Sequence, residues 1–355
     1  MHRFAWGPGL AAACLVHVAV AAGGPAARDF GPLRIRDQFV LGMGFLAFDP
    51  IDAHTLPPGH SRVEAVLTQT NTFASSGAVE QALETRPDRR PVGLDFLRGF
   101  GDRTFFLDGE VSRLAVAMSH GLTPRLQIEL TAQMLRFGGG FQDAVIEEFH
   151  RGFGLDQKGR LGAPRNAFTV YVRTPERELF IDGPNRSGLS DTVLSMEWAL
   201  LAPEAPAQLA LQGLAKLPTG NNDALFSTGS LDYGVQLAGS WDLHAGCLHG
   251  AVGVLRLGEW ELLGIDEQTL LSAMAAYEQA IGEARSVIGQ LTYSQSPFED
   301  LGIPELGKDS IQMSLGFKQR LDEHRRFFLA LTENVQNFDN TADVGFHVGY
   351  VQEFP

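Results

Sequence analysis

The sequence predicts an all-β protein, a transmembrane antiparallel β-barrel of about fourteen strands with twelve as the alternative. Apolar and polar residues alternate over long stretches; in 126–134, Leu126, Ile128 and Leu130 alternate with Gln127 and Glu129. Successive side chains of a strand point to opposite faces, so each stretch has one apolar and one polar face. The chain also begins with an export signal, and no later segment has the roughly 18 uncharged apolar residues of a transmembrane helix. Together these observations favour a barrel with lipid outside and water inside.

The beginning of the chain has the layout of a secretory signal peptide. A basic start at His2 and Arg3 precedes an apolar core at 10–22, and small residues follow. We expect cleavage after residue 21 or 22, which gives a signal peptide at 1–22 and a barrel domain at 23–355. A transmembrane anchor is the alternative, but the apolar core is shorter than the roughly 20 residues that a spanning helix needs.

The composition indicates which kinds of partner and crosslink the protein is expected to lack. The chain has 28 basic and 42 acidic residues, which argues against binding to nucleic acid. Loss of Cys14 with the signal peptide leaves Cys247 alone, so no intramolecular disulfide is expected, and Cys247 is interpreted as a small wall residue. We expect no cofactor and no resident metal.

The expected strands are long, as tilted membrane crossings require. They lie at residues 34–48, 62–73, 104–118, 125–137, 166–173, 191–201, 207–217, 230–242, 247–258, 268–279, 284–295, 309–321, 326–336 and 342–354. Two of them are ambiguous. Residues 270–281 also fit an amphipathic helix, and the alternation in 104–118 breaks around 108–113, which suggests a β-bulge.

The connections differ in length. Short turns are expected at 121–124, 203–206, 245–246 and 322–324, whereas 74–103, 138–165, 218–229 and 296–308 are long and rich in Gly, Pro, Asn and Asp. Outer-membrane barrels have this asymmetry, with short periplasmic turns and long external loops. The expected location is therefore the outer membrane of a Gram-negative bacterium, with its lipid as a partner.

Several segments resemble a family of uncharacterised proteins of Gram-negative bacteria, defined as a domain of unknown function. The matching residues are Gly31-Pro32-Leu33 with Arg36-Asp37-Gln38, Asp108-Gly109-Glu110 with Arg113, and Gly138-Gly139-Gly140 followed by Ile146-Glu147-Glu148-Phe149-His150, Phe153-Gly154-Leu155 and Gly159-Arg160. The resemblance implies an outer-membrane barrel over nearly the whole mature chain, without an assigned activity.

Shorter fragments resemble strand–loop junctions of barrels that import aromatic compounds. They are 188–191, 216–220 and 229–232. Barrel-assembly machinery commonly reads a terminal aromatic residue, which makes it an expected partner of the last strand. Here Phe354 is penultimate and Pro355 ends the sequence.

The loop 138–160 is the most distinctive candidate site. A short helix over 141–149 would bring Glu147 near His150 and Arg151 on one face. The segment is expected to fold into the lumen, either as a constriction that sorts solutes by charge or as a loop whose charges pair with the wall. A weak metal site is a further alternative.

Charged residues on the polar faces complete the expected lumen. Asp108 and Glu110 share a strand face, and a lumen wall explains them better than paired acid–base carboxylates do. The residues expected to line or constrict the lumen are Asp108, Glu110, Arg125, Glu129, Asp143, Glu147, Glu148, His150, Arg151, Arg160, Lys216, Lys318 and Arg320.

Three functional hypotheses follow. The first is a channel or facilitator for small solutes of unknown identity, with the loop 138–160 constricting the lumen. The second is an outer-membrane enzyme acting on lipid or peptide, with a site such as His150 and Glu147. It lacks a G-x-S-x-G, Walker A or H-E-x-x-H motif. The third is a soluble periplasmic β-sandwich that binds a ligand.

Overall fold

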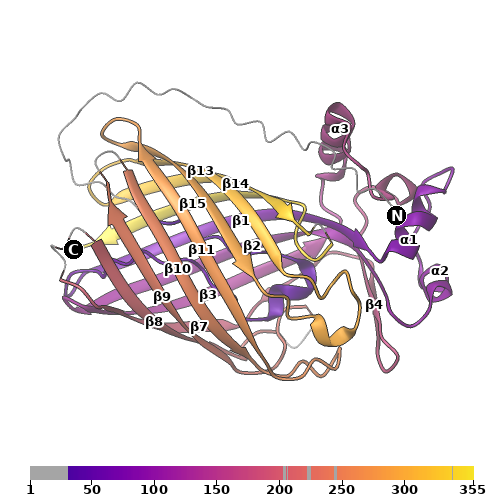
Figure 1. The fold of residues 1–355 in the computed structure, drawn as a ribbon, viewed down its shortest axis with the longest axis horizontal. Helices are drawn as coiled ribbons and strands as arrows, with labels where there is room; N and C mark the ends of the chain where they lie inside the picture. Colours follow the sequence, from indigo (N-terminus) through magenta and orange to yellow (C-terminus); the bar gives the residue numbers. More distant parts are fainter. Residues whose placement is uncertain (1–30, 203–204, 206, 222–224, 244–245, 338) are drawn as a thin grey trace, which may run out of the picture.

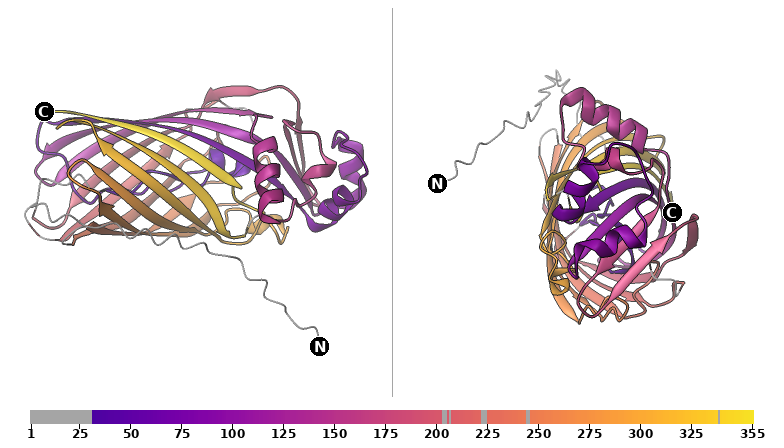
Figure 2. Two further views of the ribbon diagram at one scale, coloured as in Figure 1. Left: turned by 90° about the horizontal axis from the view of Figure 1, so that it is seen from above. Right: turned by 90° about the vertical axis from the view of Figure 1, so that its right-hand side faces the viewer.

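Twelve strands form a closed antiparallel barrel in the computed structural model, which describes residues 31–355 except 203–204, 206, 222–224, 244–245 and 338. The expected signal peptide at 1–22 lies outside the described residues. In order around the barrel the strands are β1 (Ser61–Ser75), β2 (Thr104–Thr123), β3 (Leu126–Gly138), β7 (Thr192–Ala199), β8 (Ala207–Leu217), β9 (Asp232–Asp242), β10 (Gly246–Leu257), β11 (Gln268–Ala280), β12 (Arg285–Ser294), β13 (Ser310–Arg320), β14 (Arg325–Gln336) and β15 (Val344–Phe354). Pairing of β15 with β1 closes the ring (Figures 1 and 2).

The alternation in the sequence sorts side chains between the two surfaces of this wall. On β13, Met313 and Leu315 are exposed on the outer surface, while Gln312 and Ser314 are buried on the inner one. A wall that is apolar outside and polar inside suits lipid around the barrel and polar groups within it. This arrangement confirms the transmembrane barrel and excludes the β-sandwich hypothesis, which needs apolar side chains packed between two sheets.

The two ends of the barrel differ. The end at which β2 meets β3, β7 meets β8, β9 meets β10, β11 meets β12 and β13 meets β14 is called the short-turn end, and β15 finishes there. The opposite end, at which β1 leads to β2, β3 to β7, β8 to β9, β10 to β11, β12 to β13 and β14 to β15, is called the long-loop end. The expected asymmetry of connections is therefore present.

Two expected strands are not part of the wall, which accounts for twelve strands rather than fourteen. Residues 34–48 lie inside the barrel and include only the 3-10 helix η1 (Val40–Gly44). Residues 166–173 contain β4 (Thr169–Arg173), which pairs with residues 104–108 at the start of β2 and with β5 (Glu178–Asp182). Both segments are extended and alternate in polarity, but alternation alone does not select a strand's partner.

The two ambiguous stretches resolve as barrel strands. Residues 270–281 fall largely in β11, where both neighbouring strands satisfy the backbone. No bulge is found at 108–113, where β2 pairs with β1 in continuous register. The alternation breaks there because that part of β2 is buried on both faces by the long-loop end.

The remaining elements decorate the long-loop end (Figure 1). They are α1 (Gly77–Glu84), α2 (Leu94–Leu97), η2 (Arg98–Phe100), α3 (Asp143–Phe153), η3 (Arg160–Gly162), β6 (Arg186–Leu189) and η4 (Glu299–Leu301). Among the described residues, no helix has both the length and the apolar character needed to cross a membrane.

Candidate functional site: the occupied lumen

The lumen is occupied by residues 31–56, here called the lumen segment. It enters near the short-turn end, reaches η1 near the long-loop end, and returns to begin β1 at Ser61. The indigo chain inside the ring of strands shows this path (Figure 2). The loop 138–160 was expected to fold into the lumen. It lies instead beyond the barrel at the long-loop end (Figure 1).

The entry of the lumen segment is held through its backbone. The Gly31 N–H donates to Glu278 at 3.0 Å, and Lys318, which pairs with Glu278 at 2.8 Å, donates to the Gly31 carbonyl. Both backbone groups of Leu33 meet one wall side chain. Its N–H donates to Gln290 Oε1 at 2.9 Å, and Gln290 Nε2 donates to its carbonyl at 3.0 Å. A polar wall can thus hold an apolar residue without leaving buried amides unpaired.

Ion pairs fix the middle of the lumen segment. Arg34 donates two hydrogen bonds to Glu129, at 2.8 and 2.6 Å, and its guanidinium lies 3.6 Å from Glu64. On the returning leg, Asp49 accepts a hydrogen bond from Arg113 at 3.3 Å. A two-bond arginine–carboxylate pair has a defined geometry as well as a favourable energy, so it positions the chain.

A buried lysine anchors the segment near the long-loop end. Lys216 Nζ donates to the Gly44 carbonyl at 2.7 Å and lies 3.0 Å from both Asp191 and Asp232. Asp232 also accepts a hydrogen bond from the Leu46 N–H at 2.8 Å. The Lys216 side chain is only 3 % exposed, so its charge depends on these two carboxylates.

The tip of the lumen segment is apolar. Phe39 packs edge-on against Phe298 with ring centroids 5.8 Å apart, and Phe45 packs against Trp260 at 5.5 Å. These rings belong to a buried cluster that includes wall and loop residues of the long-loop end. The lumen is therefore filled by an apolar core at the long-loop end and by polar contacts between that core and the short-turn end.

Two glycines of the inner wall make room for the segment. A Cβ on Gly253 would lie 2.0 Å from the ring of Phe48, and a Cβ on Gly316 would lie 3.0 Å from the Leu33 side chain. Both positions are occupied by hydrogen, which lets these side chains approach the wall. The inner surface is thus shaped to fit the segment.

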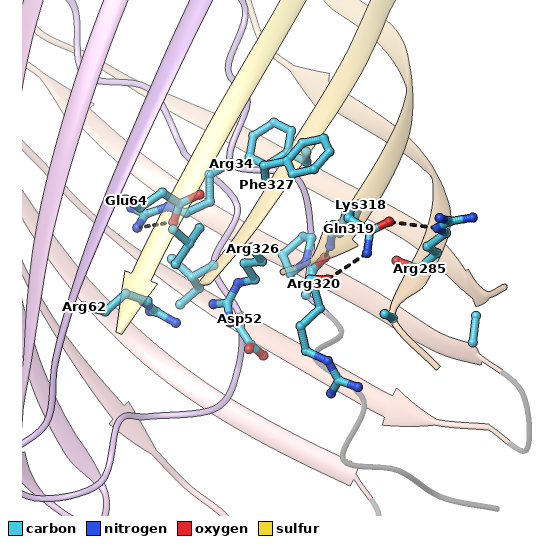
Figure 3. A pocket seen from close by; sticks show the side chains of 18 of the residues that line it. Arg34, Asp52, Arg62, Glu64, Arg285, Lys318, Gln319, Arg320, Arg326 and Phe327 are labelled. Carbon is cyan, nitrogen blue, oxygen red and sulfur yellow. Dashed lines mark hydrogen bonds and ion pairs between the residues drawn. The ribbon is translucent and has the colours of Figure 1, made fainter. Parts of the chain in front are cut away.

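Cavities remain beside the lumen segment, and two of them bear on the path through the lumen. One opens at the short-turn end and encloses about 960 Å³ with its opening. The other, of about 790 Å³, lies between the segment and β10–β13 toward the long-loop end. Figure 3 shows the charged side chains around the first cavity.

The short-turn cavity is lined by side chains of both charges. The basic residues are Arg34, Arg62, Arg285, Lys318, Arg320 and Arg326, and the acidic ones are Asp52, Glu64, Glu129, Glu197 and Glu283. The two signs are interspersed, with Arg34 and Arg62 close to Glu64 and Arg326 close to Asp52 (Figure 3). The cavity therefore does not present a single sign of charge to a solute.

The expected lumen residues therefore divide into three groups. Glu129, Lys216 and Lys318 lie on the inner wall and bind the lumen segment. Arg320 lines the short-turn cavity, whereas Arg125 is exposed in the turn between β2 and β3. The third group lies outside the lumen, on the outer side of β2 or in α3 and the loop after it. It consists of Asp108, Glu110, Asp143, Glu147, Glu148, His150, Arg151 and Arg160.

Asp108 and Glu110 face the outside of the barrel wall. Along β2 they are an even number of residues from Leu114 and Met118, which are exposed on the outer surface. The pairing of β2 shows no register shift between residues 108 and 118, so all four side chains point to the same side of the strand. Glu110 accepts hydrogen bonds from the backbone N–H groups of Phe141 and Gln142 at the start of α3. The sequence placed these residues on one face correctly but could not tell which face looks inward.

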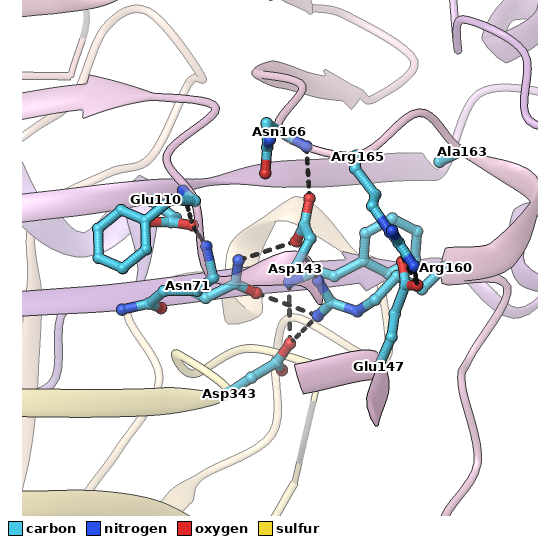
Figure 4. Close-up of polar contacts among 12 residues, drawn as sticks. Asn71, Glu110, Asp143, Glu147, Arg160, Ala163, Arg165, Asn166 and Asp343 are labelled. Atoms are coloured by element: carbon cyan, nitrogen blue, oxygen red, sulfur yellow. Dashed lines mark hydrogen bonds and ion pairs between the residues drawn. The ribbon is translucent and has the colours of Figure 1, made fainter. Parts of the chain in front are cut away.

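Asp143 and Arg160 form a buried cluster on that outer face (Figure 4). Arg160 donates to Asp143 at 2.7 Å, to Asp343 at 2.6 Å and to Asn71 at 3.1 Å. Its guanidinium also lies over the Phe73 ring, 4.7 Å from the centroid. Burial raises the pKa of Asp343 above its ordinary value, although Arg160 opposes the rise.

The remaining expected residues lie on α3. Glu147 is buried and accepts hydrogen bonds from Arg89 at 2.7 Å and Arg165 at 2.6 Å. Glu148 and Arg151 are exposed and paired with each other. His150 Nδ1 lies 2.8 Å from the Asp156 carbonyl oxygen, so the His150–Glu147 pair of the enzyme hypothesis is not formed.

The glycine run 138–140 has a local structural role. A Cβ on Gly139 would lie 1.8 Å from the Asn166 carbonyl oxygen, and one on Gly140 would lie 1.8 Å from the Glu110 carboxyl carbon. Gly140 also has φ +60°, a conformation that glycine adopts readily. This run lets the chain turn tightly from β3 onto the outer face of β2.

Sequence reasoning missed the lumen segment itself. Its Gly31-Pro32-Leu33 and Arg36-Asp37-Gln38 were recognised only as points of family resemblance. Arg36 donates to the carbonyls of Phe45 and Gly42, and so closes the turn around η1. Mixed charge within an otherwise strand-like pattern is the signal that marks this segment.

Solved structures that resemble the chain are outer-membrane barrels. The crystal structure of the COG4313 outer membrane channel from Pseudomonas putida F1 matches with a TM-score of 0.53 and 14 % identity, covering 87 % of this chain and 100 % of that one. The Pseudomonas putida toluene transporter TodX matches with a TM-score of 0.40 and 9 % identity, covering 91 % and 99 %. The NanC porin gives 0.44 and 9 %, covering 82 % and 100 %.

The sequence comparisons complete this picture. Among curated proteins, none matches the sequence. A family model described as "Protein of unknown function (DUF3187)" matches residues 99–354, which include all barrel strands except β1. The chain belongs to the DUF3187 family, and its fold is a transmembrane β-barrel with a polar inner wall and an occupied lumen.

Proposed function

We propose that this protein is an outer-membrane channel for small polar solutes, exported through a cleaved signal peptide. The observation that carries the proposal is the closed barrel whose polar inner wall encloses the chain's own residues 31–56 rather than a solid core of wall side chains. Noncovalent contacts hold this segment, so it can move without unfolding the wall. Conduction requires such a movement.

The constriction lies where the lumen segment separates the two cavities. Gly31 and Lys318 line the short-turn cavity, and Ile35 and Arg36 line the other. Between them in the segment, Leu33 is held to the wall by Gln290. A small displacement of this leg from the wall would join the cavities into one path. The proposal therefore assigns occlusion to the lumen segment in place of the loop 138–160.

Charge at the constriction predicts little preference between cations and anions. Lumen-facing Glu129, Lys216, Lys318 and Arg320 include both signs, and basic and acidic side chains are interspersed around the short-turn cavity. A lining of mixed charge gives neither cations nor anions a net advantage. We expect a reversal potential near zero in a salt gradient across a planar bilayer.

A reversible crosslink tests the gate. A Cβ on Gly31 would lie 3.6 Å from the Asp52 Cβ, the separation found in disulfides, so Gly31→Cys with Asp52→Cys would tie the entering leg of the lumen segment to its returning leg. The Cys247→Ser background removes the native thiol, which is buried. The same purified protein is then recorded in planar bilayers when oxidised and after reduction, with each single-cysteine variant as a control.

The outcomes separate the two parts of the proposal. Wild-type protein should conduct, oxidation should lower its open probability at least several-fold, and reduction should restore it. Bilayers that stay sealed with the wild type and with the reduced variant would overturn the channel. Equal conductance in both redox states would overturn gating by the lumen segment alone.

We also propose that β15, which ends at Phe354, is the strand that barrel-assembly machinery recognises. Phe354 pairs with Ser61 of β1 at the closure of the barrel, and its side chain is exposed on the outer surface. Phe354→Ala should lower the yield of assembled, heat-modifiable protein in the outer membrane. An unchanged yield would argue against this role.

A further inference from the structure

Helix α3 has its polar face toward the protein and its apolar face toward the surroundings. Phe141, just before the helix, and Val145, Phe149 and Phe153 recur every four residues and therefore lie on one side. Phe141 is 68 % and Phe153 71 % exposed. A helix in contact with water and a protein core shows the reverse arrangement.

The inward face is fixed by buried ion pairs. Asp143 is bound by Arg160 and by the Asn166 N–H at 2.6 Å, and Glu147 is bound by Arg89 and Arg165. Burial alone would raise the pKa of Glu147, but the hydrogen bonds from both arginines lower it below its ordinary value. These contacts hold the orientation, so the aromatic side chains are not exposed by chance rotation of the helix.

The outer surface of the barrel shows where α3 stands relative to lipid. Neighbouring outward residues form rows across β1, β2 and β3. The last apolar row is Leu67, Leu114 and Met134, and the next row toward the long-loop end is the polar set Gln69, Ser112 and Arg136. The change from apolar to polar marks the edge of the hydrocarbon region.

The start of α3 is attached just above that edge. Its backbone binds Glu110, which is four residues from Leu114 along β2. At about 3.4 Å per residue and a strand tilt of about 40°, this separation corresponds to a height of about 10 Å. That height matches the headgroup region, where amphipathic helices lie with their apolar face about 5–10 Å into the acyl boundary.

We propose that α3 is an interfacial helix whose Phe141, Val145, Phe149 and Phe153 insert into the lipid leaflet at the long-loop end. Lipid is favoured over a protein partner because the start of α3 is bound on the outward side of β2, the side that faces lipid at Leu114, and only about 10 Å above the last apolar row. The helix thereby clamps the long-loop end to the membrane surface. The inference depends on the transmembrane barrel and not on channel activity.

Spin labelling at neighbouring helix positions tests this placement. In the Cys247→Ser background, Phe149→Cys and Phe153→Cys report on the apolar face, and Glu148→Cys and Arg151→Cys are matched controls on the same helix. The labelled full-length mature protein is reconstituted into vesicles of phosphatidylcholine and phosphatidylglycerol. Accessibility to oxygen, which concentrates in lipid, is compared with accessibility to a water-soluble nickel chelate. Heat-modified gel mobility verifies that each variant is folded.

We expect labels at 149 and 153 to be several-fold more accessible to oxygen than to the nickel chelate, and labels at 148 and 151 to show the reverse. Equal nickel accessibility at all four positions would overturn the proposal, because the apolar face would then be in water. Exclusion of both reagents at 149 and 153 would also overturn it, because protein would cover the face. Dipolar coupling between labels on different molecules would instead identify a second copy as the occupant.

Discussion

The lumen segment lies inside the barrel, whereas α3 is bound to the outward side of β1 and β2 at the long-loop end, through Asn71 and Glu110. Inside, the lumen segment directs charged and backbone groups to the wall and gathers its aromatic tip into a protein core. Outside, α3 directs carboxylates to the protein and aromatic rings away from it. Each segment pairs its charges within protein, but only the outer one leaves apolar groups exposed. The difference shows that the medium beyond each surface, enclosed lumen or lipid leaflet, decides which side chains turn outward.

The largest expected effect comes from Lys216→Met, which tests the inside. The change leaves Asp191 and Asp232 buried together without their cation, and breaking a buried pair in this way costs about 3–5 kcal/mol. Denaturant unfolding in detergent micelles measures the loss, and bilayer recordings should show a higher open probability. The double change Lys216→Met with Asp232→Asn should recover part of the stability; no recovery would mean that the cost does not arise from the carboxylates.

The corresponding change outside is Arg160→Met. Arg160 compensates Asp143 and Asp343 on the outer face, so its loss should cost about 3 kcal/mol. Because the cluster lies outside the wall, conductance should remain that of the wild type while protease sensitivity of 138–165 rises. Altered conductance would show that the two sides of the wall are coupled.

A smaller effect is expected from Gly253→Ala. The added Cβ conflicts with the Phe48 ring, and overpacking of this kind costs about 1–3 kcal/mol. Displacement of the lumen segment should raise the open probability. Gly250→Ala on the same strand is the matched control, because its Cβ would meet only an ordinary contact at 3.8 Å. The double change Gly253→Ala with Phe48→Ala should return to wild-type behaviour if the ring is the cause.

The smallest effect concerns the pH response of α3. The pKa of Glu147 is lowered in the folded protein. The stability that its ionised form contributes is therefore fully present above about pH 4.3, the pKa of a glutamate in the unfolded chain, and it is lost as the pH falls through the lower pKa of the folded state. Because its arginine partners are partly exposed, we expect a loss of about 1 kcal/mol. Mobility of a spin label on α3 measures the release.

Two controls isolate that contribution. Glu147→Gln should remove the transition near this pH, and Glu148→Ala, which breaks only an exposed pair, should change stability by about 0.2–0.5 kcal/mol. Asp343 has the opposite effect on stability as the pH falls. Its pKa is raised by burial, so its protonation removes a charge that is unfavourable in the folded protein. A transition that persists in Glu147→Gln would assign the response to another group.

Strand content was predictable because period-two alternation is a local property. The stretches that became the twelve wall strands carried an outer apolar face that lipid requires, and the positions of short and long connections followed from turn residues. The segment 34–48 was predicted as a strand, and its first residues do alternate in polarity, Ile35 being apolar between Arg34 and Arg36. Its partners, however, are wall side chains such as Gln290 rather than a neighbouring strand.

The candidate site was predictable only in part. Glu129, Lys216 and Lys318 lie on polar faces of regular strands, so their inward position followed from alternation. Asp108 and Glu110 also share a face, but that part of β2 is buried on both sides and the polarity pattern no longer identifies the lumen. A short helix at 141–149 was predicted, but its place outside the barrel was not.

The sequence by itself determined that the chain builds long amphipathic strands, because alternation of side chains acts between adjacent residues. Only the tertiary structure decided what occupies the interior, because contacts such as Arg34 with Glu129 and Lys216 with Gly44 join residues 95 and 172 positions apart. Closure of the ring creates the enclosed space, and its shape and charge select the segment that fills it.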